Sequence, residues 1–460
     1  MRLSPLITVL TALIVMIIIG GLSARLVWPS RPLLAEVRLS LAKITPNADG
    51  IDDVARISYT VSRNAKITIS FIYQATGQHF IFRNAEQRPA NSYQVLFSGV
   101  VDGYSTPSDF AGNTIQTRLV PNGDYIWIVE ALADDNGERQ STSGTLTIAE
   151  ANTMLPFLTD FSVSPQVFTP NQDGINDRVN INVSLETNAV LTVYLEDKDR
   201  QYRYYIPERN EGRKPGELGA HYFDYDGGVD NDTTPPPDGG YTVVAVAEDK
   251  EGQRVQRAAN VILKDGGLPK AEIAAQPNTG GAVFYTRAPY KESYFNDSTI
   301  QGETIPIPQG VISLAATITM PQNDMLIFRL TVSNYGPTSL RTVGPWPGTV
   351  YQYNQQAPAG ATGAVDGTWR IGLECEGTET TFPWRWAIGS EDQLTKVGHN
   401  GETLWYLPPG KQAVVWGAIR MTKLIPTRNP QECWAALIHE GVSTPLLQNH
   451  VGPIKVKLIP

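Results

Sequence analysis

Cysteine is almost absent from this sequence: only Cys375 and Cys433 occur among its 460 residues. Their spacing matches no zinc motif, but the two thiols can pair in an oxidising compartment, so we predict a Cys375–Cys433 disulfide. The sequence also lacks a long run of lysine or arginine, and 46 acidic residues against 37 basic ones give a net charge of -9. A chain without a basic patch has no electrostatic footprint for nucleic acid, which excludes that class of partner.

Motifs that carry catalytic chemistry are also missing. The five histidines are scattered, and none lies in a metal-binding His-Glu-x-x-His motif. There is no Gly-x-Ser-x-Gly nucleophile motif and no phosphate-binding loop. We therefore expect that the protein is not an enzyme, and no residue is a candidate for catalysis or for binding an organic cofactor. A secreted hydrolase whose site is assembled only by folding is the open alternative.

A long uncharged apolar run occupies residues 6–22 and can cross a bilayer if its flanking residues help. The segment that ends it, Leu22-Ser23-Ala24, is a poor match to a signal-peptidase site, which favours an uncleaved anchor. We predict a transmembrane signal anchor at 1–24 and a proline-stiffened stalk at 25–35. We expect the Gly- and Pro-rich body to lie outside the cytoplasm, with the membrane as one partner.

Glycine (40 residues) and proline (33) are abundant, which is typical of many short strands joined by turns. The motif Thr-Pro-Asn-x-Asp-Gly-Ile-x-Asp occurs twice, at 45–53 and 169–177. Because Asn and Asp side chains can accept backbone N–H groups and glycine tolerates positive φ, each copy should form a compact, self-bonded turn. Alternating apolar and polar residues follow each copy, which indicates strands with one buried face.

Further landmarks repeat in the same order. A Pro-(Asn/Asp)-Gly-x-Tyr segment at 121–125 recurs at 237–241, and each copy ends in an Asp and Gly turn before its last strand. This order resembles the immunoglobulin-like domain of the flagellar hook-capping scaffold protein and of many bacterial surface proteins. It also resembles the sorting-type domains of secreted Bacteroidetes-like proteins. In that family the domain lies at the extreme C-terminus, whereas both copies are internal here, so we do not carry over the secretion role. The resemblance covers 36–264 and implies two tandem spacer modules.

The last third of the chain has a different composition. Most of its tryptophans lie there, after a Gly- and Pro-rich linker at 265–283, among recurring strand-like runs. The run Leu-Thr-Val-Ser-Asn-Tyr-Gly at 330–336 and the turn Leu-Pro-Pro-Gly-Lys at 407–411 are similar to those of adhesion-type sandwiches and of BsuPI-like proteinase inhibitors. The segment Phe-Pro-Trp-Arg-Trp at 382–386 adds to the second likeness. These features predict a third β-sandwich at 284–460.

The sequence therefore predicts an all-β protein with three β-sandwich (immunoglobulin-like) domains in tandem behind one N-terminal transmembrane helix. The first immunoglobulin-like domain spans 36–150 and the second spans 160–264, and the Trp-rich sandwich spans 284–460.

The repeated motif is also a candidate calcium site, because its oxygen-bearing side chains stand at alternate positions as in an EF-hand loop. The candidate ligands are Asn47, Asp49 and Asp53 in the first copy and Asn171, Asp173 and Asp177 in the second. The analogy fails at both ends of the loop, where Thr45 replaces the first acidic ligand and Arg56 replaces the bidentate glutamate. We favour a calcium-free turn and keep Ca²⁺ as the alternative. The acidic loop at 224–238 has the same two interpretations.

Two tryptophans suggest a binding surface. Trp384 and Trp386 share one face of a predicted strand with Arg385 on the other face, so the indoles can form a platform for a sugar or a peptide. Filling of the sandwich core is the alternative role.

Together these features predict a membrane-anchored, extracytoplasmic structural or binding protein. An immunoglobulin-like stalk presents the C-terminal β-sandwich to an envelope protein or a surface glycan, in cell-surface adhesion or as an envelope assembly subunit. The alternatives are a proteinase inhibitor displayed at the surface and the secreted hydrolase.

Overall fold

The structure, a computed structural model, describes residues 9–11, 13–18, 31–106, 109, 112–199, 201–209, 214–276, 281–285, 304–308, 316–355 and 365–460. Residues 9–11 and 13–18 are helical. No helix formed by the described residues is long and apolar enough to cross a membrane. The predicted anchor at 1–24 and the stalk at 25–35 fall mostly outside the described ranges.

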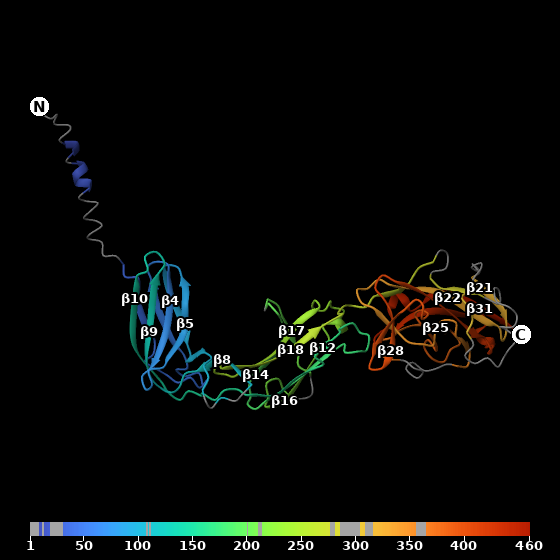
Figure 1. The fold of residues 1–460 in the computed structure, drawn as a ribbon, viewed down its shortest axis with the longest axis horizontal. Coiled ribbons are helices and arrows are strands. Elements are labelled where there is room, and N and C mark those ends of the chain that lie inside the picture. Colours follow the sequence, from blue (N-terminus) through green and yellow to red (C-terminus); the bar gives the residue numbers. More distant parts are fainter. Residues whose placement is uncertain are drawn as a thin grey trace.

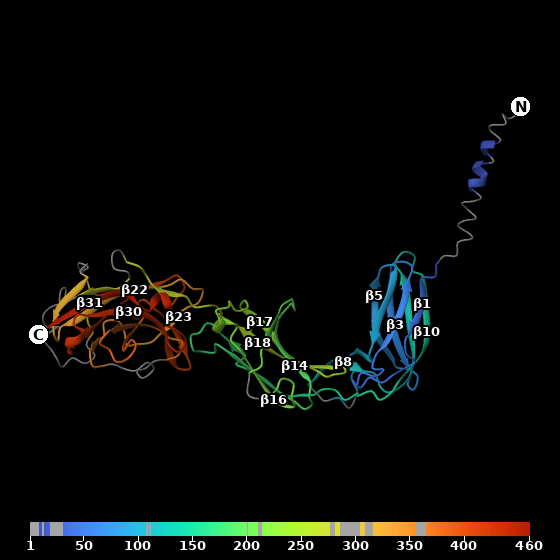
Figure 2. The same cartoon turned by 180° about the vertical axis from the view of Figure 1, so that it is seen from behind.

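The described part of the chain consists mainly of β-strands, β1 to β31, which confirms the prediction of an all-β fold. Three short 3-10 helices accompany them: η1 (Val229–Asn231), η2 (Pro426–Arg428) and η3 (Leu446–Gln448). The strands surround three large hydrophobic clusters. We name the corresponding parts the N-terminal unit (31–152), the middle unit (153–267) and the C-terminal unit (268–460). They follow one another in a row (Figures 1 and 2).

The N-terminal unit is a sandwich of two sheets, with strand orders β1-β3-β6 and β2-β10-β9-β4-β5. Every second residue of β3 is buried, as the alternation in the sequence predicted. Phe71 on β4 stacks on Phe97 on β6 with ring centroids 3.9 Å apart, which joins the two sheets. The strands are β1 (Leu34–Leu39), β2 (Lys43–Ile44), β3 (Ala55–Val61), β4 (Ala65–Tyr73), β5 (His79–Arg88), β6 (Asn91–Phe97), β9 (Gly123–Ala133) and β10 (Arg139–Ile148).

The middle unit repeats this arrangement, with a β11-β13-β16 sheet facing a larger sheet built on β15-β14-β17-β18. A tyrosine hydroxyl donates to the carbonyl four residues earlier in both units, from Tyr125 to Pro121 and from Tyr241 to Pro237, each at 2.6 Å. Such a corner is typical of immunoglobulin-like sandwiches. The strands are β11 (Leu158–Ser164), β12 (Val167–Phe168), β13 (Val179–Leu185), β14 (Val190–Asp197), β15 (Arg203–Ile206), β16 (Gly219–Tyr225), β17 (Gly239–Glu248) and β18 (Arg254–Leu263).

Two strands cross between these units. β7 (Val100–Asp102) and β8 (Thr114–Leu119) fall within the domain predicted at 36–150, yet β8 pairs with β18 and extends the large sheet of the middle unit. Ile115 stands opposite Val255 in this antiparallel pairing. The alternation of residues predicts a strand but not the sheet that it joins, so this pairing was not anticipated.

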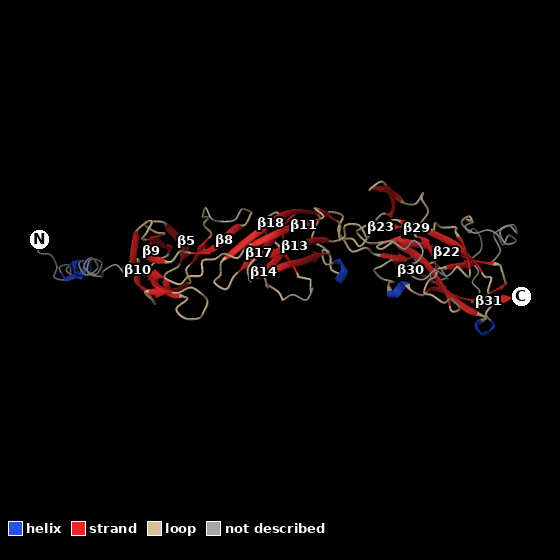
Figure 3. Cartoon of the chain, turned by 90° about the horizontal axis from the view of Figure 1, so that it is seen from below, coloured by secondary structure: helices blue, strands red, loops and turns tan. Residues whose placement is uncertain are grey.

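The C-terminal unit contains sheets with strand orders β19-β22-β29-β24, β21-β31-β30-β25-β26 and β23-β28-β27. Its first strand, β19, lies inside the predicted linker at 265–283. Strands dominate all three units in Figure 3. The strands are β19 (Ala271–Ile273), β20 (Val283–Tyr285), β21 (Thr317–Pro321), β22 (Met325–Asn334), β23 (Leu340–Thr342), β24 (Val350–Gln352), β25 (Trp369–Cys375), β26 (Trp384–Ala387), β27 (Thr395–His399), β28 (Glu402–Leu407), β29 (Gln412–Arg420), β30 (Gln431–His439) and β31 (Val451–Ile459).

The predicted disulfide is confirmed. Cys375 and Cys433 face each other as register partners on β25 and β30, and both are buried in the core of the C-terminal unit.

Replacing both cysteines by alanine should destabilise the C-terminal unit, because the bond closes a loop with a sequence separation of 58. The chain-entropy relation gives a loss of about 4 kcal/mol for a loop of this length. Guanidinium unfolding followed by tryptophan fluorescence measures it, since seven of the nine tryptophans lie in this unit. The N-terminal unit should unfold at the same denaturant concentration in both proteins. An unchanged C-terminal transition would contradict the prediction.

Candidate functional site

The repeated Asn/Asp motif forms a self-bonded loop in both copies, as its residue types predicted. The carboxylate of Asp53 accepts three backbone N–H groups of the first loop, and that of Asp177 accepts three of the second. The donors are Asn47, Ala48 and Gly50 in the first copy and Asn171, Asp173 and Gly174 in the second. Each turn is therefore complete without any group from outside the motif.

The two copies differ in what covers them. The first lies on the surface, where Ile51 is 68% exposed. The second packs against the C-terminal unit, which leaves Asn171 only 8% and Asp173 only 7% exposed. Gly174 has a φ of +82°, and a Cβ added to it would lie 2.2 Å from the carbonyl oxygen of Asp366. The backbones of the two units therefore touch at this position.

Three side chains of the C-terminal unit hold the second copy. The Tyr406 hydroxyl on β28 donates to Asp173 Oδ2 at 2.9 Å, and Arg341 on β23 donates to the Asp173 carbonyl oxygen at 2.9 Å. At the end of β30, His439 Nε2 lies 2.8 Å from the Gln172 carbonyl oxygen. A carbonyl only accepts, so this ring nitrogen carries the proton. In Figure 1, β28 lies at the end of the C-terminal unit that faces the middle unit.

The pKa of the last aspartate of the motif shifts in opposite directions in the exposed first copy and the covered second copy. In the first copy burial acts to raise the pKa of Asp53, but the three N–H bonds outweigh it and the pKa is lowered. In the second copy burial, together with the neighbouring charge of Asp173, raises the pKa of Asp177 to about 6. Burial also raises the pKa of Asp173, against the opposing effect of the Tyr406 hydrogen bond. Docking therefore places two carboxylates in a site that favours their protonated forms.

His439 connects this junction to the core of the C-terminal unit. Its ring stacks on Trp369 with centroids 4.2 Å apart and is 3% exposed. Burial lowers the pKa of His439 to about 4. The imidazole is therefore neutral at pH 7 and serves as a hydrogen-bond donor to the neighbouring unit.

Behind this histidine, Glu440 forms a buried ionic group with two arginines. Its carboxylate lies 3.6 Å from Arg370 and 2.5 Å from Arg385. Burial lowers the pKa of Arg370, which is 1% exposed. Buried charges persist only when they are paired, and the Glu440 carboxylate is paired with both arginines inside the unit.

The platform hypothesis for Trp384, Trp386 and Arg385 is wrong. Both indoles are 0% exposed, and Trp386 packs edge-on against Phe328 with ring centroids 4.6 Å apart. Arg385 is engaged by Glu440. A buried indole offers no contact area to a ligand, so these tryptophans fill the core, which was the alternative role.

An open cleft of about 770 Å³, the junction cleft, lies between the second motif and the β27–β28 hairpin. Its middle-unit wall carries Asp173, Asp238 and Asp265. Its C-terminal wall includes Val397, His399, Leu404 and Tyr406.

The other junction, between the N-terminal and middle units, is built around Gln253, which is 0% exposed. Its amide accepts the Leu119 N–H at 3.2 Å and donates to the carbonyl oxygens of Asn152 and Met154 at 3.1 and 3.0 Å. One side chain thereby joins β8, the segment between the units, and the start of β18.

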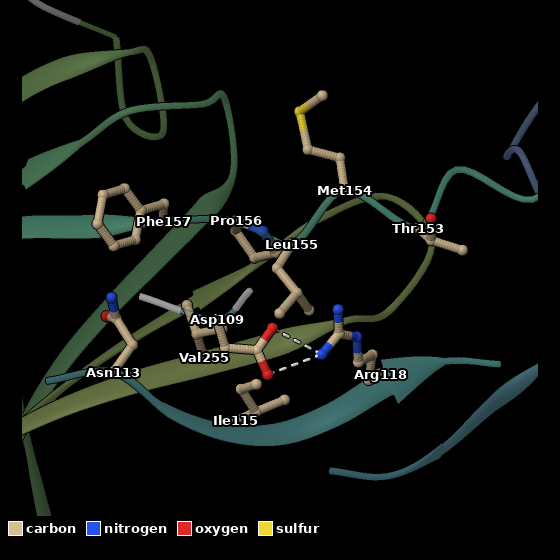
Figure 4. Close-up of a pocket in the computed structure, with 10 residues that line it drawn as sticks. All are labelled: Asp109, Asn113, Ile115, Arg118, Thr153, Met154, Leu155, Pro156, Phe157 and Val255. Atoms are coloured by element: carbon tan, nitrogen blue, oxygen red, sulfur yellow. Dashed lines mark hydrogen bonds and ion pairs between the residues drawn. The ribbon is translucent and has the colours of Figure 1, made fainter. Parts of the chain in front are cut away.

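A smaller cavity of about 200 Å³ lies at the same junction, lined by residues that include Met154 and Val255 (Figure 4). Arg118 contacts both carboxylate oxygens of Asp109 in it, at 2.8 and 3.0 Å. Apolar side chains that include Ile115 and Val255 form the rest of the wall. Because its charged groups pair with each other, this cavity presents no free charge to a ligand.

Metal binding stays an untested prediction. Among the described residues, no group of three or more His, Cys, Asp or Glu side chains is arranged to hold a metal ion. In the acidic loop at 224–238, Arg178 pairs with three carboxylates, which reduces their mutual repulsion without an ion. These partners are Asp224, Asp226 and Asp230.

Sequence reasoning missed the residues that build the junctions. Tyr406, Arg341 and His439 are more than 160 positions from the motif that they hold, and none lies in a recognisable pattern. Gln253 stands at the start of a strand without any signal of burial. Only the folded chain brings these residues together.

Comparison with known proteins gives no family: no family model and no curated protein matches the chain. The chain has similarity to several solved structures. One gives structural insight into host cell surface retention of a 1.5-MDa bacterial ice-binding adhesin. It has 9% identity and a TM-score of 0.16, and the match covers 94% of this chain and 97% of that chain. Another contains cadherin-like domains 1 to 4 of zebrafish RET. It has 9% identity and a TM-score of 0.18, and the match covers 86% of this chain and 66% of that chain. A Dscam isoform structure matches at 8% identity and TM-score 0.14, covering 94% and 78%. At these TM-scores the likeness supports no inference about function.

Replacing Tyr406 by phenylalanine should loosen the second motif, because Asp173 then loses its hydroxyl donor in a buried position. Loss of a hydrogen bond to a buried carboxylate costs about 1–3 kcal/mol. Hydrogen exchange of residues 169–177 should become faster, as measured by mass spectrometry. The control is Tyr335→Phe, because Tyr335 is 60% exposed in the same unit. Equal protection in wild type and Tyr406→Phe would contradict the prediction.

Acidification should have two opposite effects on the junction. The folded pKa of His439, about 4, is below its ordinary value of 6.5, so its contribution is present above pH 6.5 and is lost as the pH falls through 4. The folded pKa of Asp177, about 6, is above its ordinary value of 3.8, so its contribution is present below pH 3.8 and is lost as the pH rises through 6.

The variant His439→Phe keeps a ring on Trp369 but removes the titrating group. When the pH falls from 6.5 to 4, the free energy of unfolding of this variant should decrease less than that of the wild type. The difference should be up to about 3 kcal/mol. Urea unfolding at pH 7, 5 and 4 measures this difference. The same pH dependence in both proteins would show that His439 does not titrate as described.

Proposed function

We propose that the protein is a non-catalytic, membrane-anchored, extracytoplasmic protein of three domains. Two immunoglobulin-like domains of the hook-cap type form a stalk, and the C-terminal β-sandwich binds a partner in the cell envelope. The observation that carries this proposal is that specific contacts join neighbouring units at both junctions. At the first junction β8 pairs with β18, and at the second Tyr406 bonds to Asp173.

These junctions favour a stalk over independent modules on flexible linkers. Interfaces between domains usually resemble transient contacts and permit relative motion. Here Gln253 is completely buried at one junction, and Asp173 is 7% exposed at the other. Opening either junction would exchange these intramolecular hydrogen bonds for bonds to water, which costs about 0.5–1.5 kcal/mol for each bond, so both junctions resist opening. A stiff connection is what displays a binding domain at a distance from its anchor.

Two features support the location. The Cys375–Cys433 disulfide suits an oxidising compartment outside the cytoplasm. The apolar run at 6–22 supplies a segment of sufficient length for an N-terminal anchor.

The contacts of the two most buried histidines support a non-catalytic role. His221 contacts Glu208 through Nδ1 and the Glu217 carbonyl oxygen through Nε2. His439 stacks on Trp369 and donates to Gln172. Their ring nitrogens make structural hydrogen bonds and are not directed at a substrate.

The full-length protein, cross-linked in intact cells and recovered from detergent-solubilised envelopes, should bring with it a stoichiometric envelope protein. The partner should be retained when calcium is replaced by a chelator, because each Asn/Asp loop already satisfies its carboxylate with backbone N–H groups. Mass spectrometry identifies the partner, and cells that lack the protein provide the control. Recovery of the protein alone would overturn the assembly role, and loss of the partner on chelation would overturn the calcium-free loop.

A further inference from the structure

The two walls of the junction cleft differ in their chemistry. The middle-unit wall is acidic: Asp238 and Asp265 are exposed there, and Asp173 lies deeper. Among the described residues that line the cleft there is no lysine and no arginine. Lys264 lies 3.7 Å from Asp265, but both side chains are about two-thirds exposed, so this pair is weak. A concave wall with three carboxylates, opposed in the lining by His399 as the basic side chain, attracts positive charge.

The opposite wall is one face of the β27–β28 hairpin. Val397 stands opposite Leu404 and Thr395 opposite Tyr406 in the antiparallel register, so these four side chains share the face that lines the cleft. The hairpin's own lysine, Lys396, is on the other face. The ring of Trp405 lies below its ammonium group at 4.4 Å. The cleft face therefore carries no carboxylate, lysine or arginine; its basic group is His399 at the end of β27, and an exposed apolar side chain lies in its middle, since Val397 is 44% exposed.

This wall also has unused hydrogen-bonding capacity. Within the described chain β27 pairs with β28 alone and forms the edge of its sheet, so the peptide groups of its outer edge have no strand partner. At the base of the cleft, Thr338 is 5% exposed, and its hydroxyl has no hydrogen-bond partner among the described residues. An extended chain is the kind of ligand that supplies backbone donors and acceptors to such an edge.

We propose that the junction cleft binds an extended peptide segment of the partner protein that carries Lys or Arg together with apolar side chains. The cations of the segment meet Asp238 and Asp265, and its apolar side chains pack on Val397 and Leu404. The cleft volume of about 770 Å³ is within the range of ligand-binding sites. This inference rests on the proposed function and specifies its binding surface.

The observations favour this ligand over the other classes. An acidic peptide would be repelled by the carboxylates of the middle unit. A glycan usually needs an exposed aromatic face, whereas the aromatic side chain of this cleft, Tyr406, is held by its bond to Asp173. The cleft also exists only while the two units are docked, because each unit supplies one wall.

A random 12-residue peptide library displayed on phage, selected against the purified full-length protein, tests the proposal. Selected peptides should be enriched in Lys or Arg alternating with apolar residues. A synthetic copy of the most enriched peptide should bind the Asp238→Asn/Asp265→Asn protein about tenfold more weakly than the wild type, as loss of two partly exposed ion pairs predicts. Val397→Ser should also weaken binding, and higher salt should reduce the wild-type affinity.

The matched control is Asp52→Asn. It removes one carboxylate charge, as each substitution of the double variant does, at an exposed position of the first motif where the second motif has Asn176. Its affinity should equal that of the wild type. Because the Asp238 carboxylate accepts the backbone N–H groups of Asp265 and Gly266, binding is measured below the melting temperature of every variant, as determined by circular dichroism. Selection without enrichment of basic residues, or equal binding by the double variant, would overturn the proposal.

The two proposals fail separately. If the peptide binds as expected but no envelope protein is recovered from cells, the assembly role fails and the cleft remains a peptide site. If an envelope protein is recovered equally by wild type and the double variant, the proposed function holds and the cleft is not its binding surface.

Discussion

The arrangement of the C-terminal half depends on one buried carboxylate that is satisfied from another unit. Asp173 belongs to a loop of the middle unit, but Tyr406 of the C-terminal unit donates to its side chain and Arg341 donates to its carbonyl oxygen. Separation of the two units would break both bonds and return these groups to water. The same contacts place the acidic wall opposite the β27–β28 hairpin, so the geometry of the cleft follows from the bonding of this aspartate.

Local patterns were sufficient for much of the architecture. Alternation of apolar and polar residues in β3 and in β13 predicted strands with one buried face, and both strands have that burial. The repeated Thr-Pro-Asn motif and the Pro-(Asn/Asp)-Gly-x-Tyr segments predicted a duplication, which appears in the matching loops and the matching tyrosine corners. These features involve groups within a few residues of one another, and for that reason the sequence displays them.

The candidate site depends on contacts between groups that are distant in sequence, and local sequence patterns do not predict such contacts. The two copies of the motif have seven identical residues in nine, yet Asp53 has a lowered pKa and Asp177 a raised one. The difference comes from the unit that covers the second copy. The same limit applies to Trp384 and Trp386. The alternation of residues places both indoles on one face of a strand, but it does not show whether that face is buried in the core or exposed on the surface.

The β8–β18 pairing also determines where the chain can be divided. Modular proteins are usually cut between their repeats, and the segment near residue 150 is the natural choice here. A fragment ending there would leave β8 paired with β7 alone and expose Ile115, while the remaining fragment would lose the strand beside Val255. Both pieces would carry an open sheet edge, which is a template for aggregation. The N-terminal and middle units are therefore similar in arrangement but are not interchangeable parts.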